Sequence, residues 1–156
     1  DERFLKQQEA FTDVSEKLNT YISRASDLSD YMPYIKLCFE RGEAAQNYSR
    51  LIKEYNQTRD RINAEHAKVI SSVKHYWSNP ATALQLESTY NYLLKEVHDD
   101  TFLLWIGKIY EYFTTTPAKP NQAQKTADSA QVLMNKKIDE LKRQSEIIIE
   151  LMRDQI

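Results

Sequence analysis

The sequence has very little glycine, proline and cysteine. Its 156 residues include 2 Gly, 4 Pro and 1 Cys. Because glycine and proline most often mark turns, so few of them leave room for few connections and favour an all-helical chain. The single cysteine, Cys38, excludes an intrachain disulfide and a multi-cysteine metal site. It fits either a cytoplasmic protein or a bacterial periplasmic one, because periplasmic domains can do without disulfides.

Long apolar runs and an excess of one charge are absent as well. The longest uninterrupted apolar run covers residues 102–106, whereas a helix that crosses a bilayer needs about 20 such residues. Lys and Arg number 21 and Asp and Glu 23, for a formal net charge of -2. We therefore expect no membrane span within the chain and no nucleic-acid partner. The sequence begins without methionine and ends inside an apolar pattern, which predicts a domain cut from a longer protein, with flanking spans possible.

What the sequence does contain is apolar residues at alternating steps of three and four, the pattern of helices with one buried face. The expected helices cover residues 4–28, 32–76, 80–113 and the segment after a breaker-rich loop at 114–120. Gly42 is the expected position of a bend or break in the second helix. In the third, the apolar stripe slips by one position between Val97 and Leu103, which predicts a change of winding or a kink near Asp99 and Asp100.

The second and third helices read as mirror images about the turn Ser78-Asn79-Pro80. Apolar residues meet in pairs of nearly constant position sum, such as Ile52 with Ile106 and Val69 with Tyr90. Such matching is typical of a long antiparallel hairpin. With the first and last helices added, the prediction is an all-α chain: one domain over residues 1–156, folded as an antiparallel up-down-up-down four-helix bundle of long helices.

The first helix is expected to pair with the start of the second, with Val14 opposite Tyr48. In that register the start of the first helix lies opposite Thr58 of the second. The half of the bundle beyond Thr58 then has only three helices. A layer of apolar residues would then be left partly open: Ile62, Val69, Val73, Leu86 and Tyr90. Burying such a surface is favourable, which predicts self-association or a protein partner along this half.

Two polar residues, Arg59 and His66, occupy core positions of the second helix. By the mirror rule Arg59 faces Asp99 or Asp100, and a buried arginine requires a carboxylate. One interpretation is an interior ion pair that sets helix register. A second is a polar pocket in which Arg59 and His66 meet a small ligand, and a third is an arginine that reaches outward to solvent.

Residues 101–110 are apolar nearly all round the helix, so they must bury more than one face. They lie either in the middle of the bundle, or at a membrane interface, or under a partner that binds Phe102, Trp105 and Ile109.

No catalytic, phosphate-binding or metal-binding motif is present, because the two glycines are far apart and no histidine pair has metal-ligand spacing. We therefore expect no enzyme activity, no cofactor and no metal. The predicted function is a helical-bundle module for protein–protein interaction, assembly or signal transmission. In length, helix number and placement of the termini the chain also resembles the extracytoplasmic sensor domains of bacterial chemoreceptors and sensor kinases. That resemblance implies the alternative, a ligand-sensing domain.

Overall fold

The computed structural model describes residues 1–39 and 42–156, and the side chain of Cys38 lies outside what it describes. All elements of this described part are helical, which confirms the predicted all-α class. In chain order they are α1 (Glu2–Tyr31), the 3-10 helix η1 (Met32–Phe39), α2 (Glu43–Tyr76), α3 (Pro80–Asn91), the π-helix η2 (Tyr92–Leu103), α4 (Leu104–Thr114) and α5 (Pro120–Arg153).

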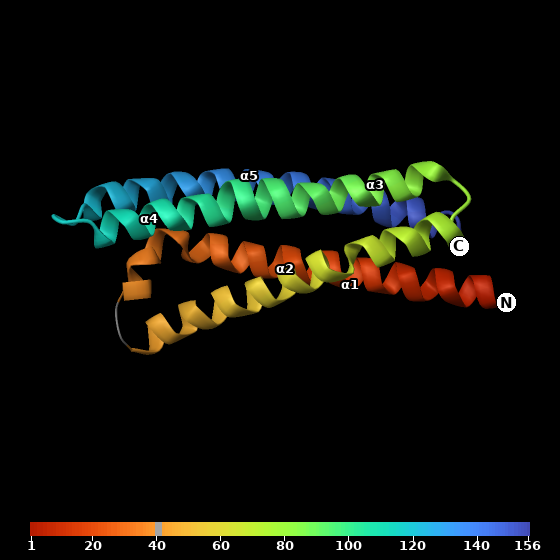
Figure 1. Ribbon diagram of the computed structural model, residues 1–156, viewed down its shortest axis with the longest axis horizontal. Helices are drawn as coiled ribbons and strands as arrows, with labels where there is room; N and C mark the ends of the chain where they lie inside the picture. Colours follow the sequence, from red (N-terminus) through yellow and green to blue (C-terminus); the bar gives the residue numbers. More distant parts are fainter. Residues whose placement is uncertain (40–41) are drawn as a thin grey trace.

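Four long helices pack against one another (Figure 1). Three are α1, α2 and α5, and the fourth is a rod formed by α3, η2 and α4, which follow one another with helical backbone angles at both junctions. α5 packs along the whole rod and against α1, and α1 packs against α2. α2 packs on α3 near their shared turn and then diverges from α4. Both chain ends lie at the end of the molecule that carries this turn.

Local signals explain where the helices begin. The Asn79 side chain accepts a hydrogen bond from the Ala81 N–H at 3.0 Å and Pro80 takes the first helical position, the arrangement that suits an N-cap followed by proline. Gly42 is the N-cap of α2, with φ at 121°, a conformation that side chains with a Cβ rarely adopt. The predicted break at Gly42 and the predicted start at Pro80 are confirmed.

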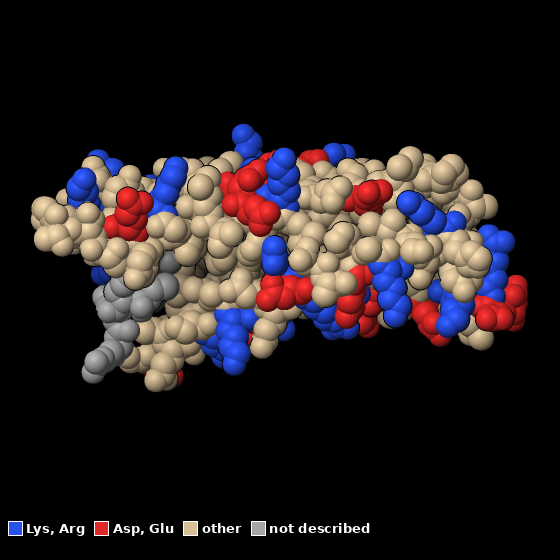
Figure 2. All heavy atoms as spheres, viewed as in Figure 1, with Lys and Arg blue, Asp and Glu red and all other residues tan. Residues whose placement is uncertain are grey.

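The core lies along the predicted apolar stripes, except toward the far end of the rod, where Leu103 is 55% and Tyr110 59% exposed. Buried residues come from all four helices and include Val14, Leu18, Tyr21, Tyr55, Ile62, Leu86, Tyr90, Met134, Ile138, Leu141 and Ile148. No helix in the described ranges has both the length and the apolar character needed to cross a membrane. On the face shown in Figure 2, acidic and basic side chains are mixed. α3 is nearly uncharged, because Glu87 is its one charged residue.

The register of α1 on α2 differs from the prediction. Tyr48, expected opposite Val14, instead packs against Tyr31, with 6.2 Å between ring centroids. At the other end of the pair, Gln7 donates a hydrogen bond of 2.7 Å to the Tyr76 carbonyl oxygen. The prediction was wrong because it placed a tight reversal before Pro33, whereas η1 separates α1 from an α2 that starts only at Glu43.

This register removes the basis for the expected self-association. α1 extends along α2 as far as Tyr76, so the far half of the bundle has its fourth helix. The layer that was expected to be partly open is instead buried: Ile62 (1% exposed), Val69 (8%), Val73 (0%), Leu86 (0%) and Tyr90 (0%).

The predicted change of winding is confirmed as the π-helix η2. A π-helix closes its hydrogen bonds over five residues instead of four, so it takes up extra residues without breaking the rod. The Thr101 Oγ1 accordingly donates to the Glu96 carbonyl oxygen, five residues earlier, at 2.7 Å. The wider turn buries neighbours in pairs, Val97 with His98 and Thr101 with Phe102. η2 therefore presents one buried side to α5 and places His98 toward α2.

Candidate functional site

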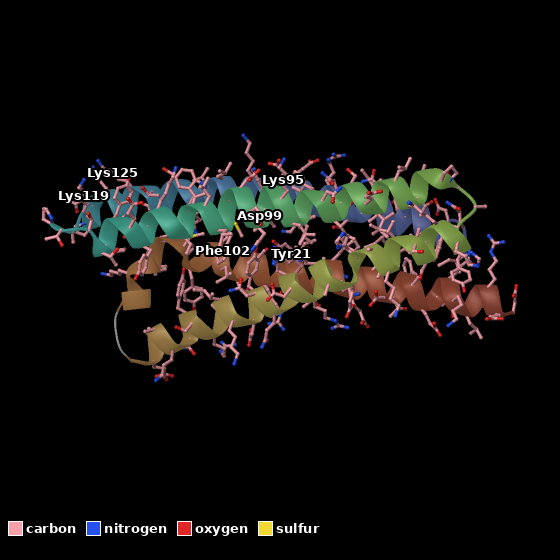
Figure 3. All side chains as sticks on the ribbon, viewed as in Figure 1. Tyr21, Lys95, Asp99, Phe102, Lys119 and Lys125 are labelled. Atoms are coloured by element: carbon pink, nitrogen blue, oxygen red, sulfur yellow. The ribbon has the colours of Figure 1, made fainter. Side chains whose placement is uncertain are left out.

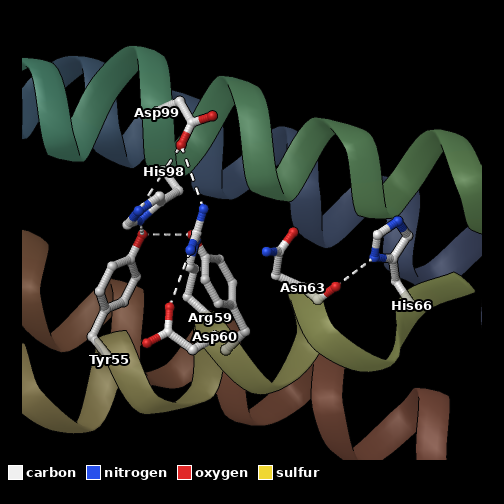
Figure 4. A network of polar contacts seen from close by, with 8 residues as sticks. Tyr55, Arg59, Asp60, Asn63, His66, His98 and Asp99 are labelled. Atoms are coloured by element: carbon white, nitrogen blue, oxygen red, sulfur yellow. Dashed lines mark hydrogen bonds and ion pairs between the residues drawn. The ribbon is translucent and has the colours of Figure 1, made fainter.

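The candidate site is a polar junction at the middle of the molecule, formed by Tyr21, Tyr55, Arg59, His98 and Asp99 (Figures 3 and 4). Tyr21 comes from α1, Tyr55 and Arg59 from α2, and His98 and Asp99 from η2. The junction thus joins three of the four helices. It lies at η2, the π-helical segment of the rod.

A chain of buried hydrogen bonds runs through the junction. The Tyr21 and Tyr55 hydroxyls are 2.7 Å apart, and the Tyr55 hydroxyl lies 3.0 Å from His98 Nδ1. The Phe102 ring covers the chain, with its centroid 4.6 Å from that of Tyr55 and 5.8 Å from that of His98. Tyr21 and Tyr55 are fully buried and His98 is 5% exposed, so these groups depend on one another for hydrogen bonds.

The tautomer of neutral His98 sets the direction of these hydrogen bonds. Burial raises the pKa of both tyrosines, and burial together with the Arg59 charge lowers the pKa of His98. His98 is therefore neutral near pH 7, with one N–H. Its Nε2 lies 3.9 Å from an Asp99 carboxylate oxygen, so we assign the proton to Nε2 and leave Nδ1 as the acceptor. Tyr55 then donates to Nδ1 and Tyr21 donates to Tyr55.

Arg59 and Asp99 come together as the mirror rule predicts, but the pair is in contact with solvent instead of buried in the interior. The Arg59 Nη2 lies 3.9 Å from Asp99 Oδ1, and Nη1 lies 3.0 Å from the neighbouring Asp60. The Arg59 side chain is 24% exposed and that of Asp99 is 50% exposed. An ion pair in such contact with solvent contributes about 1 kcal/mol or less.

The other two residues of the predicted polar set lie outside the junction. His66 Nδ1 contacts the Asn63 carbonyl oxygen of its own helix at 2.9 Å, and Figure 4 shows it beyond Asn63, away from His98. Asp100 is exposed. His98 was missed as a junction residue, although it follows Val97, where the apolar stripe slips. A shift in the apolar stripe that indicates a wider helical turn also indicates which extra residue that turn buries.

The predicted partner surface requires a correction. Phe102 is 3% exposed and Ile109 is 0% exposed, so neither is available to a partner. Trp105 is half-buried, with the Lys108 ammonium 4.7 Å from its ring centroid. The reason is that α5 covers the rod and Phe102 fills the space beside Tyr55 and His98.

A second feature is a cleft of about 510 Å³ between α1 and α2. Its charged lining is balanced, with three lysines and three carboxylates: Lys6, Lys17, Lys68, Glu9, Asp13 and Glu65. The Lys17 side chain is 6% exposed, and its Nζ contacts Asp13 at 2.8 Å and also Glu65. Its hydrogen bond and charge lower the pKa of the Glu65 carboxyl.

Among the described residues, no three His, Cys, Asp or Glu side chains are grouped as ligands for a metal ion. Fold and site together define an all-helical protein of four packed helices with a polar junction across three of them. Comparison of the chain with protein-family models, with curated proteins and with solved structures gives no match.

Proposed function

We propose that this chain is a non-enzymatic helical module that acts in protein–protein interaction, assembly or signal transmission, and that its four helices form an antiparallel up-down-up-down bundle. The observation that carries the proposal is the coincidence of the polar junction with the π-helix. Of these three roles, the observation favours signal transmission. A buried link among three helices lies where one of them has an unusual winding.

A π-helical segment inside a bundle helix is suited to transmit a change. π-helices are rare and often lie at functional sites. If η2 rewinds as α-helix, α4 must rotate and shift relative to α3, and shifts of packed helices are a known means of switching. The polar junction holds α2 to η2, directly before α4, from which α2 diverges. A change in η2 therefore alters how far α2 stands from α4.

Motion of this kind is detected by NMR relaxation dispersion, which reports exchange on the microsecond to millisecond scale. We expect exchange with one common rate in η2 and in α2 residues 43–55, and none in α5. Tyr55→Phe should change the populations of the two states, because it removes the central hydroxyl of the junction. Tyr34→Phe is the matched control, since Tyr34 is 57% exposed. A uniformly rigid η2 would contradict signal transmission through this segment.

The cleft between α1 and α2 favours a second candidate function, ligand sensing. The cleft offers both ammonium and carboxylate groups, the two kinds of charge that a zwitterion such as a free amino acid requires. Lys17 is paired with Asp13 and Glu65 and Lys6 with Glu9, so such a ligand binds at Lys68 and in exchange for these pairs. We expect one or more of the twenty amino acids to raise the melting temperature, by an amount that grows with concentration. N-acetyl amino-acid amides, which lack both charges, are the ligand control. The cleft-filling variant Ser72→Trp is the protein control, and it should abolish the shift. The absence of a shift with all twenty would dismiss this candidate.

A further inference from the structure

We propose that the polar junction is a proton-operated latch: in mild acid, protonation of His98 releases α2 residues 43–55 from η2. The inference rests on the proposed function, because it names the signal that would act on the same junction. It follows from the hydrogen bonds of His98, from the charges around it and from the way α2 is held.

Protonation breaks the pattern of hydrogen bonds in the core. Neutral His98 accepts the Tyr55 O–H at Nδ1. The imidazolium carries a proton on each nitrogen and can only donate. The Tyr55 hydroxyl must then turn toward Tyr21, and one of the two buried tyrosine protons loses its acceptor. A buried polar group without a partner is strongly unfavourable.

The charges around His98 come from each element that packs on it. From α2, Arg59 opposes a second positive charge, whereas Asp60 attracts it, and from η2 itself the half-exposed Asp99 attracts it. α1 contributes the neutral Tyr21. On α5, Lys137 is engaged by Glu96 of η2 at 2.7 Å. Burial and Arg59 outweigh the two carboxylates, so the pKa of His98 lies below its usual value.

The outer half of α2 is the segment that this event frees. Beyond the turn end, α2 packs mainly on α1 and η1, and Tyr55 and Arg59 link it to η2, Tyr55 through both His98 and Phe102. The imidazolium Nδ1–H then donates to the Tyr55 oxygen, so the link between α2 and η2 carries a buried charge and a tyrosine proton without an acceptor. Separation of residues 43–55 from η2 gives both groups access to water, which favours the open form in acid. The expected result is a wider separation between α2 and α4.

The first test is the pH dependence of unfolding in urea. Because the folded state binds this proton less readily than the unfolded state, stability is full above the unfolded pKa of about 6.5 and falls as the pH drops below it. For the natural chain, the His98 contribution raises the unfolding equilibrium constant by up to about tenfold per pH unit in that range. His98→Asn should remove this contribution. His66→Asn, which changes a histidine outside the junction, should retain it. An unchanged slope in His98→Asn overturns the proposal.

A second variant guards against a His98 substitution that fails to fold. Arg59→Gln removes the opposing charge, so it should move the acid transition and the NMR titration of the His98 ring to higher pH. A His98 ring that titrates at or above about 6.5 in the natural chain overturns the proposal.

Release of α2 is measured by electron–electron distance spectroscopy with spin labels at Lys53→Cys and Glu111→Cys in a Cys38→Ser background. Both labelled positions are exposed. We expect the mean distance to increase in mild acid, and to stay constant when His98→Asn is added. A pH-dependent stability without a change in distance overturns the latch. Exchange in η2 at neutral pH would persist in that case, so the proposed function is judged separately.

Discussion

Deletion of Asp100 is expected to leave the four helices packed, whereas deletion of Glu87 is expected to unfold the chain. Both residues are exposed and both lie in the same rod. Glu87 belongs to α-helical α3, where removal of one residue rotates everything beyond it by about 100° and turns the buried face outward. Asp100 belongs to η2, where Val97 and Phe102 are core residues five positions apart. Deletion closes that interval to four, which is an α-helical spacing.

The measurement is a urea titration followed by circular dichroism. For the Asp100 deletion we expect the free energy of unfolding to change by no more than about 2 kcal/mol. For the Glu87 deletion we expect no cooperative transition, because the loss is comparable with the whole stability of a domain, about 5–15 kcal/mol. NMR of the Asp100 deletion should also show loss of the bond between Tyr55 and His98. Unfolding of both deletions would mean that η2 does not hold an extra residue.

Tyr55→Phe is expected to destabilise the protein, and Tyr90→Phe to leave it unchanged or stabilise it. Both tyrosines are fully buried, and the two substitutions remove the same oxygen. The Tyr55 hydroxyl serves Tyr21 and His98 at once, so its removal leaves two buried groups unpaired, at roughly 1–3 kcal/mol each. The Tyr90 hydroxyl is buried without a hydrogen-bond partner in the described structure, so its loss removes a polar group that gains nothing from folding.

Urea unfolding of the two variants at neutral pH gives this comparison directly. Because ring packing is retained in both, the difference between them isolates the hydrogen bonds of the polar junction. Equal destabilisation by both substitutions would contradict the hydrogen-bond assignment at His98. A stabilising Tyr55→Phe would contradict it still more strongly.

The sequence determined by itself that the chain is helical, where its third and fourth helices lie, and which face the fourth helix buries. Periodicity and capping act within a few residues, so Asn79 with Pro80 and the stripe through Met134, Ile138 and Leu141 could be read directly. The slip after Val97 likewise predicted a change of winding, because the spacing of core residues must match the local turn of the helix.

Only the tertiary structure decided how the helices pair and which polar groups meet. The register of α1 on α2 depends on the path of the chain between Tyr31 and Glu43, and an apolar stripe that repeats every three or four residues fits its neighbour in several registers. The wrong register predicted that the far half of the bundle lacks a fourth helix. The polar junction depends on three helices and on the wider turn of η2, which buries His98 beside Tyr55 and leaves Asp100 in solvent. Such a cluster is a property of packing, because no short segment contains its members.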